Sequence, residues 1–163
     1  MDDLFQKMFL ARRIALQGLY QLDVQGEAFL LSNGLAEFAA EASDDPQVRE
    51  IAVFMARSAW QFHPTADQWF GRLAEKWPVH RMPIVDRNIL RLGAWELVNY
   101  PETPAKVALD EAINLAREFS TAESPAFVNG LLDALLREHL AATGRTLEEA
   151  SPQQSPKRGI EMP

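Results

Sequence analysis

Apolar residues recur at intervals of three and four along almost the whole chain, and this spacing limits what the chain can fold into. It is the period of an α-helix with one buried face, and the alternating runs rich in Val, Ile and Thr that would indicate strands are missing. Hydrophobic residues make up 47% of the 163 positions, enough for a core in one domain or in a tight pair of small ones. The sequence therefore predicts an all-α protein.

Proline marks the starts of several of these helices. A proline is tolerated in the first turn of a helix, and the residue before it can cap the helix with its side chain. Asp45-Pro46, Thr103-Pro104 and Ser124-Pro125 follow this pattern. The apolar spacing and these starts predict about seven helices, over residues 4–24, 33–42, 46–62, 65–76, 84–98, 104–119 and 125–142.

Two prolines close together divide the chain nearly in half. Pro78 and Pro83 interrupt the helical spacing, so a continuous helix cannot run through this segment. We therefore expect one helical domain over residues 1–145, made of two small packed bundles at about 1–77 and 84–145. A glycine inside the last helix, Gly130, is locally unfavourable, and the simplest interpretation is that another helix approaches closely there.

The C-terminal segment and the overall composition indicate where in the cell the protein is found. Residues 146–163 contain few apolar side chains, and we expect them to form a disordered tail. The chain has no cysteine, no apolar run of the roughly 20 residues that a membrane span needs, and no basic-then-apolar start typical of a secretory signal. These features predict a cytoplasmic protein with no membrane contact.

The charge is unevenly distributed along the chain. The net charge of −7 argues against a protein that coats nucleic acid by bulk electrostatics. Residues 4–22 nevertheless contain Lys7, Arg12 and Arg13 and no acidic residue, whereas residues 27–50 contain six acidic residues and one arginine. The first predicted helix is therefore locally basic on an acidic protein.

Residues that carry most enzyme chemistry are scattered. His63, His80 and His139 are scattered, and none has a second histidine at the helical spacing of a metal site. The glycines are isolated rather than grouped in a phosphate-binding loop. Adjacent carboxylates such as Asp110 and Glu111 point about 100° apart on a helix, as on a solvated face. The sequence predicts no metal site, no cofactor and no catalytic activity.

One face of the first predicted helix has the composition of an RNA reader. Arg13, Gln17 and Tyr20 fall within about 60° of one another around the helix axis. An arginine can pair with phosphate, a glutamine can bond a base edge and a tyrosine offers a stacking plane. The alternative is an exposed amphipathic helix with a half-buried tyrosine. Arg12 projects close to the apolar face, where a buried ion pair competes with a nucleic-acid contact.

Phe127 also allows two interpretations. It lies in the first turn of the last predicted helix, where most aromatic side chains belong to the core. Free backbone N–H groups at a helix start favour a phosphate, however, and an aromatic ring beside them can stack on a base.

Three blocks of the sequence match, in order, those of a known family. They are Ala11–Gln21, Val85–Leu97 and Pro104–Asp133, and they cover most of residues 11–138. The chain resembles the NusB family of bacterial transcription antitermination factors. This resemblance implies an all-helical fold of two small bundles and a binding protein without catalysis.

The resemblance also implies partners and site residues. Family members pair with the NusE ribosomal protein in the transcription elongation complex, and together they recognise boxA-type single-stranded RNA during ribosomal RNA transcription. Asp86 and its neighbour Arg87 then belong to the NusE-facing side. The implied RNA-binding set is Lys7, Arg12, Arg13, Gln17, Tyr20, Glu123, Ser124 and Phe127.

The chain departs from the family just before the first block. Family members often carry several arginines there, whereas this chain has Met8-Phe9-Leu10, so fewer phosphate contacts and a greater dependence on the partner are expected. One alternative is therefore a helical scaffold that binds protein without recognising RNA. Another is an RNA-recognition module linked to ribosomal RNA modification, against which the short length and the missing cysteine nucleophile argue.

Overall fold

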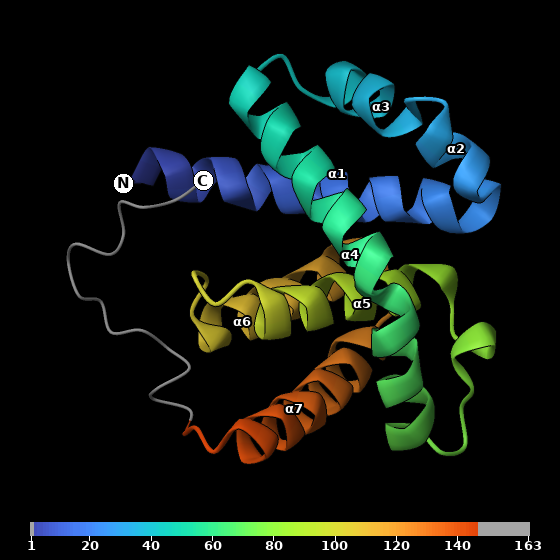
Figure 1. Cartoon of the computed structure of the whole chain (residues 1–163), viewed down its shortest axis with the longest axis vertical. Helices are drawn as coiled ribbons and strands as arrows, with labels where there is room; N and C mark the ends of the chain where they lie inside the picture. Colours follow the sequence, from blue (N-terminus) through green and yellow to red (C-terminus); the bar gives the residue numbers. More distant parts are fainter. Residues whose placement is uncertain (1, 147–163) are drawn as a thin grey trace.

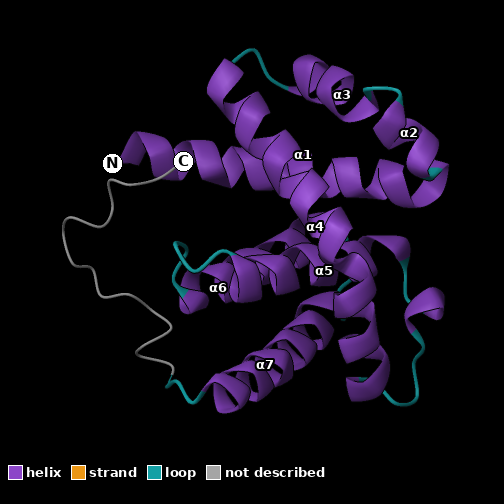
Figure 2. Ribbon diagram, in the orientation of Figure 1, coloured by secondary structure: helices purple, strands orange, loops and turns teal. Residues whose placement is uncertain are grey.

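The computed structural model describes residues 2–146, and in this part of the chain every regular element is helical (Figure 2). The elements are α1 Asp2–Gln25, α2 Glu27–Leu31, α3 Gly34–Ala42, α4 Pro46–Leu73, a 3-10 turn η1 at Val79–Arg81, α5 Ile84–Asn99, α6 Ala105–Phe119 and α7 Ser124–Thr143. The predicted all-α class is confirmed. Residues 147–163 of the predicted tail lie outside the described residues.

The helices form two packed groups that share the long helix α4 (Figure 1). In one group, α1 and α3 pack against the N-terminal part of α4. In the other, α5, α6 and α7 pack against one another, and α5 and α7 also contact α4. α1 reaches across the boundary to α5, so the two groups share one apolar core. Within residues 2–146 no helix combines the length and the apolar character that spanning a bilayer requires.

Helix α4 corrects one predicted boundary. Separate helices were expected on either side of Pro64, but α4 runs through this residue from Pro46 to Leu73. An interior proline has no N–H to donate to the carbonyl four residues earlier, which here belongs to Trp60. The Nδ1 atom of His63 lies within hydrogen-bonding distance of this carbonyl. The rings of His63 and Trp60 also pack together, with centroids 4.0 Å apart. A neighbouring side chain thus satisfies the acceptor that the proline leaves free.

The three predicted helix starts differ in what their capping side chains do. Asp45 caps α4 as expected, because its carboxylate accepts a hydrogen bond from the Gln47 backbone N–H at 2.9 Å. Thr103 and Ser124 cap nothing: their hydroxyls instead donate to the buried carboxylates of Glu96 and Asp86. These two hydroxyls therefore connect the starts of α6 and α7 to α5.

The glycines show where helices approach closely. A Cβ at Gly18 of α1 would lie 2.9 Å from the Leu35 side chain, and one at Gly93 of α5 would lie 2.8 Å from Leu132. A side chain at either position would therefore force the facing leucine to move. A Cβ at Gly130 would meet no atom within 4 Å, so the expectation of a close helix approach there is wrong. Gly130 instead lines a surface pocket.

Candidate nucleic-acid interface

Arg12 lies on the buried side of α1, against α5. Its Nε donates to the two carboxylate oxygens of Glu96 at 3.0 and 3.2 Å, and its Nη2 donates to Oε2 at 2.6 Å. The Thr103 hydroxyl donates to the same carboxylate at 2.8 Å. Burial alone would lower the pKa of Arg12, but the charge and hydrogen bonds of Glu96 raise it above its ordinary value. Arg12 therefore forms the buried ion pair that the sequence allowed as the alternative to a nucleic-acid contact.

Arg13 is half-buried at the edge of the α6 contact, and its side chain is 16% exposed. Its guanidinium carbon lies 3.6 Å from the centre of the Phe9 ring, and its Nε donates to Glu118 Oε1 at 2.8 Å, in the last turn of α6. Gln17 and Tyr20 are exposed on the same side of the helix. Arg13, Gln17 and Tyr20 form what we call the α1 face. In this face Gln17 and Tyr20 are exposed and Arg13 is half-buried beside them.

Lys7 lies near the start of α1, and acceptors surround it. Its Nζ lies 3.5 Å from an Asp3 carboxylate oxygen and 3.4 Å from one of Asp45, and it donates to Gln47 Oε1 at 2.7 Å. The pKa of Asp45 is lowered, first by the hydrogen bond from the Gln47 backbone N–H and further by the charge of Lys7. Lys7 therefore connects α1 to the N-terminus of α4, and RNA would have to compete for its charge.

The C-terminal end of α1 is tied to α5 by a second network. Asp23 accepts hydrogen bonds from Arg87 at 2.7 and 2.9 Å, from Asn88 at 2.9 Å and from Arg91 at 3.0 Å. Arg91 also donates to Asp67 of α4 at 2.9 and 2.8 Å. Burial alone would raise the pKa of Asp23, but the hydrogen bonds from Arg87 and Asn88 and the charge of Arg91 lower it below its ordinary value. Arg87, one of the two predicted partner contacts, is thus largely engaged within the protein.

Asp86, the other predicted partner contact, lies beneath the surface. Its side chain accepts hydrogen bonds from the hydroxyls of Ser120 and Ser124, and Asp86 and Ser124 are only 4% and 2% exposed. Both side chains are therefore covered in this structure. They join the N-terminal turn of α5 to the turn between α6 and α7, and in this way they position the residues that follow on α7.

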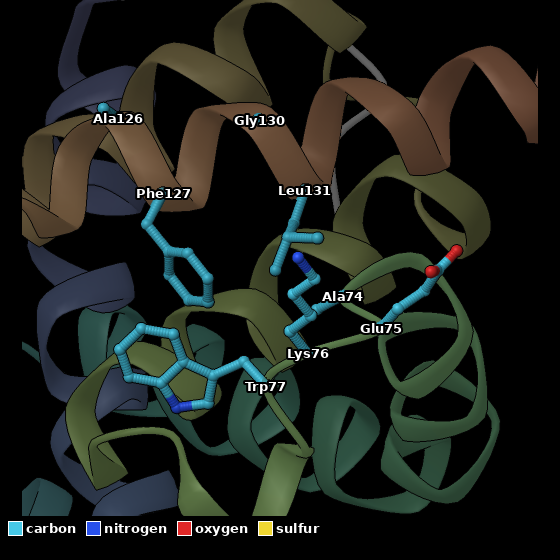
Figure 3. Close-up of a pocket in the computed structure, with 8 residues that line it drawn as sticks. All are labelled: Ala74, Glu75, Lys76, Trp77, Ala126, Phe127, Gly130 and Leu131. Atoms are coloured by element: carbon cyan, nitrogen blue, oxygen red, sulfur yellow. The ribbon is translucent and has the colours of Figure 1, made fainter.

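Phe127 and Glu123 lie at this positioned start of α7. Glu123 is exposed, and the Phe127 ring packs against the Trp77 ring with centroids 5.6 Å apart and planes inclined at 46°. The two rings line a surface pocket of about 360 Å³ with Ala74, Glu75, Lys76, Ala126, Gly130 and Leu131 (Figure 3). Trp77 is 48% exposed. We call the two rings the aromatic corner.

Sequence reasoning missed Trp77 as a candidate. A signal was present, because a tryptophan next to a proline in an otherwise polar segment, Glu75–Pro78, has no apolar face of its own helix to join. Its position beside Phe127, fifty residues further along the chain, depends on tertiary packing alone. Trp60 and Trp69, by contrast, pack against the core as the helical spacing predicts.

The fold and these surfaces define a class of protein. In the described part of the chain no group of three or more His, Cys, Asp or Glu side chains is arranged to hold a metal ion. Two surface features stand near the predicted residues: the α1 face, which combines a charge with a stacking plane, and the aromatic corner at the start of α7. This is an all-helical protein whose distinctive surfaces suit binding of another molecule.

Comparison with known proteins defines the family. The family model of the NusB family matches residues 10–137, and the chain belongs to this family. The transcription antitermination protein NusB of Streptomyces griseus is 42% identical over 125 residues, which cover 75% of this chain and 86% of that protein.

Solved structures agree on the fold. A solved structure of T. maritima NusB is 31% identical to this chain. It superposes with a TM-score of 0.66 over 82% of this chain and 92% of that one. A crystal structure of antitermination factors NusB and NusE in complex with dsRNA contains a chain with the same fold. That chain is 23% identical, with a TM-score of 0.68 over 82% of this chain and 98% of its own length.

Proposed function

We propose that this protein is a transcription antitermination factor that binds boxA-type single-stranded RNA through the α1 face and the start of α7. It does so together with a NusE-type ribosomal protein, in the cytoplasm and as part of the transcription elongation complex. Membership of the NusB family supports the antitermination role. The observation that carries the proposal is the α1 face, on which the exposed Gln17 and Tyr20 lie on the same side of the helix as the half-buried Arg13.

The second proposed RNA region follows closely in space. Arg13 contacts Glu118 at the end of α6, and Glu123 lies five residues further along the chain. A chain of that length spans at most about 18 Å, so one short strand of RNA can contact both the α1 face and the start of α7. Stacking on Tyr20 and Phe127 and a base-edge contact from Gln17 are interactions by which unpaired RNA is recognised.

The electrostatics favour assembly with a partner. Arg12 is buried, and Lys7 and Arg13 already contact acidic side chains, so few positive charges on α1 remain for phosphate. RNA binding by the isolated protein should therefore be modest and only weakly dependent on salt. A NusE-type partner that adds its own basic surface would strengthen RNA binding, and linkage requires that RNA strengthen the protein pair by the same factor.

Titration of a short boxA-type RNA, with and without the NusE-type partner, tests the proposal. Arg13→Ala or Tyr20→Ala should weaken RNA binding by about 1–3 kcal/mol without changing helicity. Arg137→Ala is the matched control, because Arg137 is an exposed arginine on α7 that pairs with Asp133 of its own helix. Equal affinities for the Arg13, Tyr20 and Arg137 variants would reject the α1 face as the RNA site.

The same titration tests a second function, a scaffold that binds protein without RNA. The engagement of all three basic residues of α1 by acidic side chains favours this alternative. It predicts that the NusE-type partner binds and that adding RNA changes neither the affinity nor the amount of the complex. Asp86 is unsuited as a docking probe for either function, because its substitution would disturb a buried hydrogen-bond cluster.

A further inference from the structure

The two rings of the aromatic corner differ in burial: Phe127 packs against the core, whereas Trp77 is exposed. Trp77 leaves nearly half of its surface in contact with solvent, although burial of so large an apolar side chain is strongly favourable. Its ring is nevertheless held in place. The indole Nε1 donates to the Arg81 carbonyl at 3.2 Å, and one edge of the ring contacts Phe127 (Figure 3). The exposed ring is therefore ordered before any ligand arrives.

The geometry of the corner defines what fits. Centroids 5.6 Å apart are already in contact, so no flat group can insert between the two rings. A flat ligand must instead lie in the adjoining pocket, against the exposed surfaces of the rings. The pocket volume of about 360 Å³ is near the lower end for ligand sites, which suits a single ring system rather than an extended ligand.

The remaining lining residues agree with a planar ligand attached to a charged chain. Gly130 and Ala126 of α7 leave one wall without bulky side chains, and the floor near Leu131 is apolar. Lys76 is exposed at the rim, its side chain extending towards α7, while the Glu75 carboxylate points away from the rings (Figure 3). An aromatic platform with a cation at its edge is the arrangement by which proteins hold a stacked base and its phosphate.

We propose that the aromatic corner binds one unpaired nucleobase of the RNA, stacked on Trp77 beside Phe127, with Lys76 near the adjoining phosphate. This inference rests on the proposed function, because it extends the RNA path from the α1 face past the start of α7. Trp77 is the residue that it adds. The site recognises a stacking plane rather than a pattern of hydrogen bonds, so it should tolerate different bases.

The first test is substitution of the platform. Trp77→Ala should weaken binding of a boxA-type RNA by about 5- to 150-fold, the range expected for loss of one stacked base. Trp77→Phe, which keeps a flat ring, should retain most of the affinity. Binding should also quench tryptophan fluorescence in the unmodified protein, and Trp77→Phe should remove this quenching while binding persists.

The second test blocks the pocket without removing a ring. Gly130→Leu adds a side chain at a position with open space around it and replaces a poor helix former, so stability should not fall. It should nevertheless weaken RNA binding to a similar degree. Asn129→Leu is the matched control, because it adds the same side chain at an exposed position of α7 that does not line the pocket.

The third measurement identifies the base. RNAs that lack single bases are titrated against the unmodified protein and against Trp77→Ala. One abasic position should weaken binding to the unmodified protein but cause no further loss with Trp77→Ala, because the two changes remove the same contact.

The outcomes separate the two proposals. If Arg13→Ala weakens RNA binding while Trp77→Ala and Gly130→Leu do not, the aromatic corner is not an RNA site although the proposed function stands. If Trp77→Ala weakens binding of the NusE-type partner but leaves binding of RNA alone unchanged, the corner holds a protein side chain and the inference is overturned. If the unmodified protein binds no RNA with or without the partner, both proposals fail.

Discussion

Arg12 and Arg13 are neighbours in α1, and each forms an ion pair with a glutamate from the second group of helices. The Arg12 and Glu96 side chains are 6% and 2% exposed, whereas those of Arg13 and Glu118 are 16% and 46% exposed. The buried pair has several hydrogen bonds and a third member, Thr103, while a single carboxylate oxygen of Glu118 accepts from Arg13. The same two residue types therefore occur in two different environments, one step apart along the helix.

The comparison shows how exposure decides what a charge does. A buried ion pair has lost its water and depends on its partner, so removing one member leaves an uncompensated charge. An exposed pair is screened by water and contributes little to stability, so its members remain able to exchange partners. The buried pair therefore holds α1 against α5, and the exposed pair belongs to the surface that we propose for RNA.

Breaking the buried pair should have the largest effect. Glu96→Ala leaves Arg12 and the Thr103 hydroxyl without their acceptor, and we expect it to lower the free energy of unfolding by about 3–5 kcal/mol. For a chain of this size that corresponds to a fall in melting temperature of roughly 10 °C, measurable by circular dichroism. An unchanged melting temperature would show that the pair contributes nothing to holding α1.

The conservative substitution Arg→Lys sharpens the comparison at both positions. Arg12→Lys cannot reproduce the two-point contact with Glu96, so we expect a clear loss of stability, on the order of 2 kcal/mol. Arg13→Lys at the exposed pair should change stability by less than about 0.5 kcal/mol. Chemical denaturation of the two variants side by side measures the difference, and equal effects would contradict the assignment of separate roles.

Acid should weaken the hydrogen-bond network that joins Asp23 of α1 to α5. The pKa of Asp23 is lowered in the folded protein, so its ionised form contributes stability above the ordinary aspartate pKa of about 3.9. This contribution is lost as the pH falls through the lower folded pKa. Asp23→Asn should therefore be less stable than the unmodified protein at neutral pH, and the difference should shrink in acid. Denaturation curves between neutral pH and pH 3 test the sign.

The exposed pair should show the smallest effect on stability and the opposite effect on binding. Glu118→Gln removes the charge that competes with phosphate for Arg13, and we expect the free energy of unfolding to change by less than about 0.5 kcal/mol. RNA affinity should rise several-fold, because the Arg13 guanidinium no longer has to leave a carboxylate. The increase should vanish when Arg13 is already alanine; an increase that persists there would reflect general charge rather than this pair.

The helical class could be read from the sequence because it depends on local spacing. The period of three to four residues and the start at Asp45-Pro46 are properties of short segments, and the structure has the corresponding helices. The two wrong predictions, at Pro64 and at Gly130, arose because local spacing does not report on tertiary contacts. The continuity of α4 through Pro64 depends on how the His63 side chain is placed, and the open space at Gly130 depends on where other helices lie.

Some residues of the candidate site could likewise be found from the sequence, whereas others could not. Periodicity alone places Arg13, Gln17 and Tyr20 on one face of α1, and the family resemblance draws attention to Phe127. Periodicity places Arg12 near the apolar side but cannot supply Glu96, which lies 84 residues away in the sequence. Nor can it show that Asp86 is covered by Ser120 and Ser124, or that Trp77 meets Phe127.

The sequence by itself thus determined the all-helical class, most helix positions, the family and the composition of the α1 face. Tertiary structure alone decided which arginine is buried, which carboxylates connect helices and where an aromatic pair remains exposed. The physical reason is that helix formation and amphipathic faces follow from neighbours within a few turns. Burial and ion pairing depend instead on side chains that only the packed fold brings together.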